Sequence, residues 1–275
     1  MRKNNSVLLS IPYILWMLAF TLIPLGVVGY YALTDPDTGI FTLSNLWQLR
    51  DWDYIKVMLD SILYALASAA ICLLLGYPVA YFIAHCKPVT QKFLYMLVML
   101  PMCMSFLLRT MAWVGLLQDT GIINRLLEGL GLGKVRLIRT PGAVILGMVY
   151  NYLPYMILPL YSTIAKIDNR LIEAAEDLGC NGVQVFGRVV LPLSMPGILS
   201  GVTMVFVPAV STFYISQKLG NPDTVLIGDV IERLFKQGNN ANLGAALSLV
   251  LMLLVFVCTG IMNRFGSDDE GSVVA

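Results

Sequence analysis

Six apolar stretches divide this chain, and each is long enough to cross a hydrocarbon core about 30 Å thick at about 1.5 Å of helix per residue. They cover residues 8–33, 61–84, 93–117, 142–165, 196–217 and 243–263. Runs such as 62–84 are apolar on every side, whereas a membrane β-barrel alternates apolar and polar residues in segments of about ten. The sequence therefore predicts an all-α polytopic membrane protein, with six transmembrane helices in a single domain over residues 1–275.

The composition excludes several other classes of protein. Apolar residues make up 57% of the 275 residues and charged residues only 13%, against about 45–50% and about 25% in a soluble domain. A formal net charge of +1 lacks the basic excess with which nucleic-acid-binding proteins neutralise phosphates. Five cysteines are too few for a disulfide scaffold in so long a chain. We therefore expect membrane lipid, and not nucleic acid, around this protein.

The connection between the fourth and fifth spans, residues 166–195, carries the clearest local pattern. Asp168 or Asn169 can cap a short helix, and Gly179 can end it in a left-handed conformation. Apolar residues recur along it at helical spacing: Leu171, Ala174, Ala175 and Leu178. This apolar face is too small to fold alone, and the acidic residues beside it disfavour anionic headgroups. The pattern indicates a helix in the groove of a basic protein partner, with an interfacial helix on the lipid as the alternative.

The order Glu173-Ala174-Ala175, then Gly179, then Leu191-Pro192 resembles the EAA loop of permease subunits of bacterial ABC importers. Further matching segments lie at 74–80, 107–109, 140–145, 153–156, 159–162, 208–209 and 213–214. Together they are similar to the spermidine/putrescine permease branch. The resemblance implies the type I ABC importer permease fold, with a coupling helix seated on a cytoplasmic ATPase subunit. It implies that role for Glu173, Ala174, Ala175, Asp177 and Gly179.

The resemblance also implies partners and a location. The partners are a second homologous permease subunit, two ATP-binding subunits that hold ATP and Mg²⁺, and an extracytoplasmic substrate-binding protein. Because a loop seated on the ATPase must be cytoplasmic, both termini are expected in the cytoplasm of a multi-pass bacterial inner-membrane protein. Basic residues do not decide the orientation, since eight would lie inside and nine outside. Cysteine placement agrees with it, because Cys86 and Cys180 would then be cytoplasmic.

The chain itself offers no catalytic set. The segment 129–134 resembles a phosphate-binding loop, but Glu128 stands where the first glycine is required and Val135 where serine or threonine is required. The single histidine, His85, cannot assemble a metal site. No acidic pair lies in a span to relay protons. We therefore expect no enzyme activity, cofactor or metal in this chain, and ATP hydrolysis on a partner subunit.

Polar residues inside the spans mark either helix contacts or a conduction route. The fifth span is the most polar, and Pro208 permits a kink there. Aromatic rings at this depth suit an organic cation, which each ring would hold by roughly 0.5–2 kcal/mol. The predicted pathway residues are Tyr152, Tyr155, Ser211, Phe213 and Tyr214. For each of them an interhelical hydrogen bond is the alternative.

The spans contain no carboxylate that would neutralise a polyamine. Charge recognition is therefore expected on the partner permease, on the binding protein or on the rim acids Asp60, Asp119, Asp223 and Asp229. Arg109 would repel a cation, and we expect it to pair with a neighbouring helix or to extend to the headgroups. The alternative function is an ATP-independent secondary carrier or channel for a small solute, which would need no coupling loop.

Overall fold

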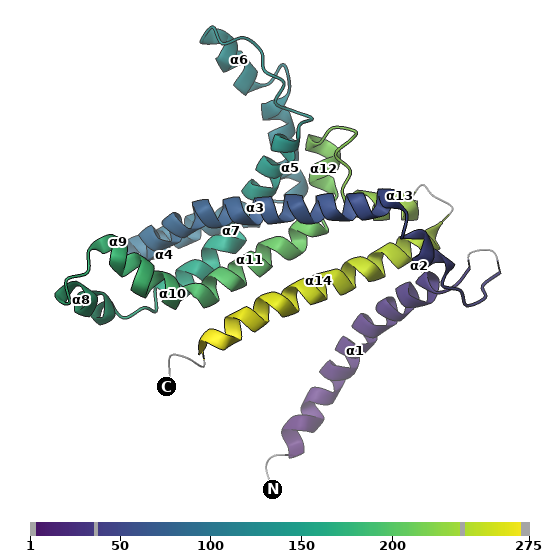
Figure 1. The fold of residues 1–275 in the computed structure, drawn as a ribbon, viewed down its shortest axis with the longest axis horizontal. Coiled ribbons are helices and arrows are strands. Elements are labelled where there is room, and N and C mark those ends of the chain that lie inside the picture. Colours follow the sequence, from purple (N-terminus) through teal and green to yellow (C-terminus); the bar gives the residue numbers. More distant parts are fainter. Residues whose placement is uncertain (1–3, 36–37, 237–239, 271–275) are drawn as a thin grey trace. The chain divides into compact units, whose positions relative to one another are not determined.

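The computed structural model describes residues 4–35, 38–236 and 240–270, and its regular structure is helical (Figure 1). In those ranges the only β feature is an isolated bridge between Thr34 and Phe41. The chain divides into two compact units. The smaller consists of residues up to 55 with 230–254, and the larger of residues 56–229 with those from 255 onward. The single domain over residues 1–275 stays a prediction.

Four helices in the described ranges are long and apolar enough to cross a membrane. They are α1 (Asn4–Ala32), α3 (Trp52–Ala84), α7 (Pro141–Ile164) and α14 (Ala241–Glu270). Two bent pairs of helices are further candidates, one over Pro88–Cys103 with Phe106–Gly129 and one over Gly182–Leu193 with Met195–Val210. If each bent pair crosses the membrane once, the described chain has the six spans that the sequence predicts.

The third predicted span, 93–117, is not one continuous helix. Helix α4 (Pro88–Met99) and the short 3-10 turn η1 (Leu100–Cys103) stop before Met104, whose backbone is extended. Helix α5 (Phe106–Leu117) then begins, and the two halves are bent by 88°. Pro101 contributes to this break because its ring has no N–H to donate to a helix. The prediction of an unbroken helix over 93–117 is therefore corrected.

The fifth predicted span, 196–217, is interrupted as well. Helix α11 (Met195–Val210) stops before three residues that are not helical, and helix α12 (Tyr214–Leu219) follows them. Pro208 lacks an N–H, and the Ser211 hydroxyl donates to the carbonyls of Val207 and Pro208 at 3.3 and 3.4 Å. Carbonyls left free at the end of the helix are satisfied in this way. The polar residues predicted for this span therefore lie at a helix break.

Helices α7 and α11 pack side by side in the larger unit (Figure 1). Gly197 and Gly201 lie on the face of α11 that meets α7. A Cβ atom at Gly197 would come within 2.8 Å of the Thr163 Cβ, and one at Gly201 within 2.7 Å of the Met156 Sδ. Because hydrogen stands in place of a side chain, the two backbones approach closely, as in small-xxx-small packing of membrane helices.

Two buried asparagines organise the smaller unit around helix α2 (Ser44–Gln48). The Asn45 side chain donates from Nδ2 to the carbonyls of Ala32 and Thr34 at 3.2 and 2.9 Å. The Asn242 side chain donates from Nδ2 to the same Thr34 carbonyl at 2.6 Å. Within this unit, these bonds hold the last residues of α1 beside the first turn of α14.

The remaining helices are short and lie in the connections. They are α6 (Ile122–Gly129), α8 (Asn169–Asp177), α9 (Gly182–Val185), the π-helical turn η2 (Phe186–Val190), α10 (Leu191–Leu193) and α13 (Ile227–Lys236). In the larger unit, α8 and α9 lie together at one end, and α6 and α12 lie away from them (Figure 1). The loop singled out by its sequence pattern thus occupies one end of this unit.

Candidate functional site

Helix α8 begins and ends at the residues that its sequence pattern suggests. The N-cap is Asp168, whose carboxylate accepts a hydrogen bond from the N–H of Arg170 at 3.0 Å. At the other end the Gly179 N–H donates to the Glu176 carbonyl at 2.8 Å, and the next N–H donates to the Ala175 carbonyl at 3.1 Å. These two bonds form a Schellman motif. Gly179 has φ +85°, a left-handed conformation that favours glycine and sets the direction of the chain after the helix.

The apolar face of α8 is left open by the rest of the chain. Leu171 is 49% exposed and Leu178 is 86% exposed, and their spacing of seven places them on one face. Of the predicted coupling residues, Glu173, Ala174, Asp177 and Gly179 are exposed and Ala175 is half-buried. An open apolar stripe beside acidic side chains is typical of a surface that another protein covers.

Aromatic rings anchor the second half of the loop to α3. Phe186 lies edge-on to Tyr77, with 5.5 Å between ring centroids, and 6.1 Å from Tyr81. The Tyr77 hydroxyl shares a 2.8 Å hydrogen bond with the Ser194 hydroxyl, just before α11. These contacts anchor the chain after α8. Helix α8 itself has no buried residue, so it projects from the rest of the loop.

A cavity of about 310 Å³ lies between α8 and the turn that joins α3 to α4. His85 lines it from the turn, Gln91 lines it from the start of α4, and Asn169 and Ile172 line it from α8. The Nδ1 atom of His85 lies 2.8 Å from the carbonyl oxygen of Tyr81, one turn earlier in the chain. Because α8 covers open space here, its position depends on its two ends more than on packed side chains beneath it.

The predicted pathway residues of α7 differ in burial. Tyr152 is 7% exposed, and its hydroxyl donates to the carbonyl of Pro208 in α11 at 3.3 Å. This is the interhelical bond that the sequence leaves open as the alternative. Tyr155 is 36% exposed, and its ring centroid lies 6.4 Å from that of Tyr152. Ser211 bonds to the end of its own helix. Of these three residues, Tyr155 remains the one with an open side chain and an aromatic face.

The residues after the break in the fifth span bring an aromatic ring next to a cation. Phe213 is 41% exposed. The ring centroid of Tyr214 lies 6.2 Å from that of Phe106 in α5, and the Lys218 Nζ lies 5.8 Å from the Tyr214 centroid. Tyr214 thus contacts α5 through an aromatic ring, whereas Tyr152 contacts α11 through a hydrogen bond.

Arg109 is buried in α5 and does not reach the surface, because its side chain is only 6% exposed. Its Nε and Nη1 atoms have no hydrogen-bond partner among the described residues. The expectation that it extends to the headgroups is therefore corrected. Helix α5 packs against α7 and α12, and the Arg109 side chain is covered by protein.

The acidic residues predicted for the outer rim do not form one site. Asp60 and Asp223 line a cavity of about 360 Å³, whose lining contains no basic residue. Asp119 lines a different cavity together with three basic side chains. Asp229 is buried and accepts a hydrogen bond from the Leu226 N–H at 2.9 Å. Within the described ranges, no group of three or more His, Cys, Asp or Glu side chains is arranged to hold a metal ion.

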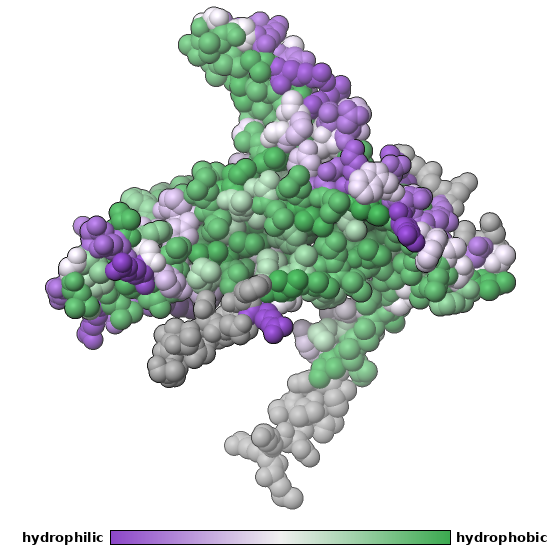
Figure 2. Space-filling model, viewed as in Figure 1, coloured by the Kyte–Doolittle hydropathy of each residue, from purple (hydrophilic) through white to green (hydrophobic). Residues whose placement is uncertain are grey.

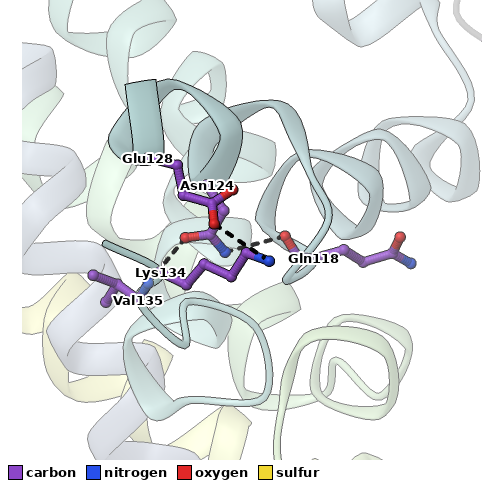
Figure 3. Close-up of polar contacts among 5 residues, drawn as sticks. All are labelled: Gln118, Asn124, Glu128, Lys134 and Val135. Carbon is purple, nitrogen blue, oxygen red and sulfur yellow. Dashed lines mark hydrogen bonds and ion pairs between the residues drawn. The ribbon is translucent and has the colours of Figure 1, made fainter. Parts of the chain in front are cut away.

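The arm, residues 118–140 with α6 in it, connects α5 to α7, and Figure 3 shows polar contacts within it. Asn124 of α6 is fully buried and bridges its two sides, donating to the Gln118 carbonyl at 3.2 Å and accepting from the Val135 N–H at 3.0 Å. An ion pair between Lys134 and Glu128, at 3.4 Å, closes the same turn. These contacts join the residues on either side of α6, and they fix the backbone of the arm shortly before α7.

Sequence reasoning missed the contacts between distant segments. Two aromatic pairs join residues that are far apart in the sequence, namely Phe106 with Tyr214 and Phe186 with Tyr77. No local sequence pattern predicts either contact. The glycines of α11 differ in this respect. The spacing Gly197-x-x-x-Gly201 is a recognised signature of close helix packing in membranes, and it would have identified the face of α11 that meets α7.

Comparisons with known proteins cover the loop and the pathway residues together. Residues 73–267 match a family model described as the binding-protein-dependent transport system inner membrane component. The chain is 38% identical over 247 residues to the spermidine/putrescine transport system permease protein PotB of Escherichia coli (strain K12), covering 87% of this chain and 90% of that protein. It is 40% identical over 253 residues to the protein of the same name from Haemophilus influenzae, covering 88% of each.

Solved structures share the fold. A bacterial ABC transporter involved in the import of the acidic polysaccharide alginate aligns with a TM-score of 0.76 at 20% identity, covering 97% of this chain and 96% of that chain. The MetNI methionine ABC transporter, in an inward-facing conformation, aligns with a TM-score of 0.61 at 16% identity, covering 82% and 97%. At these identities the likeness concerns the fold alone, and it confirms the predicted fold class.

Proposed function

This chain belongs to the family of binding-protein-dependent transport system inner membrane components, and from that premise we propose that it forms half of the translocation pathway of an ATP-driven polyamine importer. The substrate class rests on the identity of 38% and 40% to spermidine/putrescine permease proteins over most of the chain. The family consists of transport components and not of enzymes. ATP hydrolysis, with its Mg²⁺, therefore takes place on partner subunits.

Helix α8 is the coupling helix in this proposal. Its open apolar face, its N-cap and its left-handed C-terminal turn support a helix seated in a groove of an ATP-binding subunit. The coupling residues are Glu173, Ala174, Ala175, Asp177 and Gly179. The loop and both termini then lie on the cytoplasmic side of a bacterial inner membrane.

The pathway needs a second permease subunit, because six helices are too few to enclose a route comfortably. The candidate residues are Tyr152, Tyr155, Ser211, Phe213 and Tyr214. Among them, Tyr155 and Phe213 retain open aromatic surface that suits weak cation–π contacts. The full assembly contains two permeases, two ATP-binding subunits and an extracytoplasmic binding protein. Weak contacts suit a route that must also release its substrate.

Uptake of radiolabelled spermidine into proteoliposomes tests this proposal. The vesicles contain this chain with its co-purified partners, with and without internal ATP, and with and without the binding protein. Unlabelled putrescine, thiamine and an amino acid serve as competitors. We expect uptake that requires both ATP and the binding protein and that only putrescine reduces.

The other outcomes separate the parts of the proposal. ATP-driven uptake of a different solute would retain the coupling role of α8 and reject the polyamine assignment. Uptake driven by a gradient alone, without an ATPase partner, would reject both and favour a secondary carrier or channel.

The exposed leucine at the end of α8 provides a direct test of coupling. We expect Leu178→Glu to reduce the amount of ATP-binding subunit that co-purifies with the chain by about tenfold. Burying a leucine contributes about 1.5–3 kcal/mol, and a carboxylate in its place would lose its hydration in the groove. The measurement is the ratio of the two subunits after affinity purification.

The matched control is Leu130→Glu, since Leu130 is 75% exposed on the arm away from α8. This variant should keep the full ratio of ATP-binding subunit. A normal ratio for Leu178→Glu, or an equal loss for both variants, would contradict the coupling role of α8.

A further inference from the structure

A basic cavity of about 580 Å³ lies at the junction of α5, α12 and the residues that lead into α7. Arg136 and Arg139 line it from the arm, and Lys218 lines it from α12. Asp119 is the one acidic side chain in the lining. All three basic side chains are exposed, so they remain accessible to a ligand from outside. Three cations against one carboxylate make this cavity a site for an anion.

The fold defines the course of the backbone that carries the two arginines. Arg136 directly follows Val135, whose N–H donates a hydrogen bond to the buried Asn124 side chain. Arg139 has φ +56°, and in the described ranges it is the only residue other than glycine with a positive φ. It stands immediately before Thr140, whose hydroxyl caps α7 by accepting from the Ala143 N–H at 3.1 Å. The arm and the helix cap therefore define the direction of the chain on both sides of Arg139.

The chemistry of the cavity excludes the polyamine and fits carboxylates. A polycation would be repelled by the excess of positive charge. A guanidinium group binds a carboxylate in a bidentate geometry. Two arginines and a lysine together can therefore bind more than one acidic group. Figure 2 shows hydrophilic side chains gathered along one side of the arm, whereas the face of α3 in view is apolar. Such a surface suits a water-soluble protein better than a lipid.

The position of the cavity identifies which protein. It lies where α7 begins, while α8 follows the other end of this helix of 24 residues, which is about 36 Å long at 1.5 Å per residue. If α8 faces the cytoplasm, the cavity faces the opposite side of the membrane. There the assembly meets its extracytoplasmic binding protein.

We propose that the basic cavity formed by Arg136, Arg139 and Lys218 receives acidic side chains of the extracytoplasmic substrate-binding protein. This inference rests on the proposed function and adds a docking site and its charge. Asp119, suggested from the sequence as a rim acid for polyamines, then belongs to the docking site and limits its positive charge.

Helix α12 connects this docking site to the pathway. It has six residues, with Tyr214 at one end and Lys218 one turn later, and the Lys218 Nζ lies 5.8 Å from the Tyr214 ring centroid. A carboxylate that binds Lys218 therefore lies close to the ring of a proposed pathway residue.

The test is a titration of ATPase activity with the binding protein, using the purified complex in nanodiscs. The variant is the double substitution Arg136→Gln with Arg139→Asn, because asparagine tolerates a positive φ. We expect the half-saturating concentration of binding protein to rise at least tenfold, with the maximal rate unchanged. Higher salt should raise that concentration for the unmodified complex and affect the variant much less.

Arg125→Gln is the matched control, since Arg125 is exposed on α6 but does not line the cavity. It should titrate as the unmodified complex does. A second double variant combines Arg136→Lys with Arg139→Asn. It should bind the binding protein more tightly than the first double variant, because lysine keeps the charge of Arg136 while the bidentate geometry is lost.

An unchanged half-saturating concentration in the double variant would overturn the docking site. So would a difference that appears only in nanodiscs of anionic lipid, which would assign the cavity to a phosphate headgroup. Direct binding of the binding protein to the complex is measured alongside. Failure of ATP-driven uptake by the unmodified complex would thus reject the proposed function. Unchanged binding of the binding protein to the double variant would reject only the docking site.

Discussion

Replacing Gly179 by valine is expected to reduce ATP-driven uptake at least about tenfold while the chain still reaches the membrane. The φ of +85° at this residue is unfavourable for any side chain, by roughly 1–2 kcal/mol in general and by more for a β-branched one. A Cβ there meets no other atom within 4 Å, so the cost lies in the backbone. Relief of that strain opens the Schellman turn and redirects α8. Uptake and membrane abundance are measured on the same preparations.

Two further substitutions isolate the turn. Gly179→Asn should retain most of the uptake, because asparagine tolerates the left-handed conformation. Gly182→Val should also retain it, since Gly182 lies three residues further on with open space around it and without a positive φ. If Gly179→Val transports normally, the turn has no part in coupling. If Gly182→Val fails equally, the surface of the loop and not the turn is the sensitive feature.

Gly197→Leu is expected to prevent a stable chain from accumulating. A Cβ at this position would lie 2.7 Å from the Thr163 hydroxyl oxygen and 3.1 Å from the backbone carbonyl oxygen of Pro159. The backbone of α7 cannot move aside locally, so the two helices must separate. Overpacking alone costs about 1–3 kcal/mol or more, and separation also removes the van der Waals contacts that hold membrane helices together. The yield of monodisperse protein and its Tm provide the measurement.

Gly115→Leu is the control for helix and residue type. Gly115 lies in α5 with no atom within 4 Å of an added Cβ, so this variant should accumulate like the unmodified chain. Normal yield and Tm for Gly197→Leu would show that α7 and α11 tolerate separation, contrary to the packing described above.

Local chemistry made several features readable from the sequence. The long apolar runs require helices, because backbone groups in lipid must bond within their own segment. The ends of α8 follow from Asp168 and Gly179, whose preferences act over three or four residues. The resemblance carried by Glu173-Ala174-Ala175 and Gly179 pointed to the permease family, to which the matched range of residues 73–267 belongs.

Other features depend on contacts that no local pattern encodes. Pro101 and Pro208 indicate from the sequence that the backbone near them is irregular. Only the structure shows where each helix stops, at the extended Met104 and at the three residues after α11. The sequence left open whether Tyr152 lines a pathway or makes an interhelical hydrogen bond, and the structure shows that its hydroxyl donates to the Pro208 carbonyl of another helix. Burial and pairing of this kind arise only when α7 and α11 come together.

The amino-acid sequence by itself determined that the chain is a helical membrane protein and that a capped, amphipathic helix follows the fourth span. Both follow from hydropathy and from short-range backbone preferences. The tertiary structure alone decided that the face of α8 stays open, that Arg109 is buried, and that Asp119 shares a cavity with Arg136, Arg139 and Lys218. The reason is physical, because exposure and electrostatic surroundings depend on segments that are distant in the chain and adjacent only after folding.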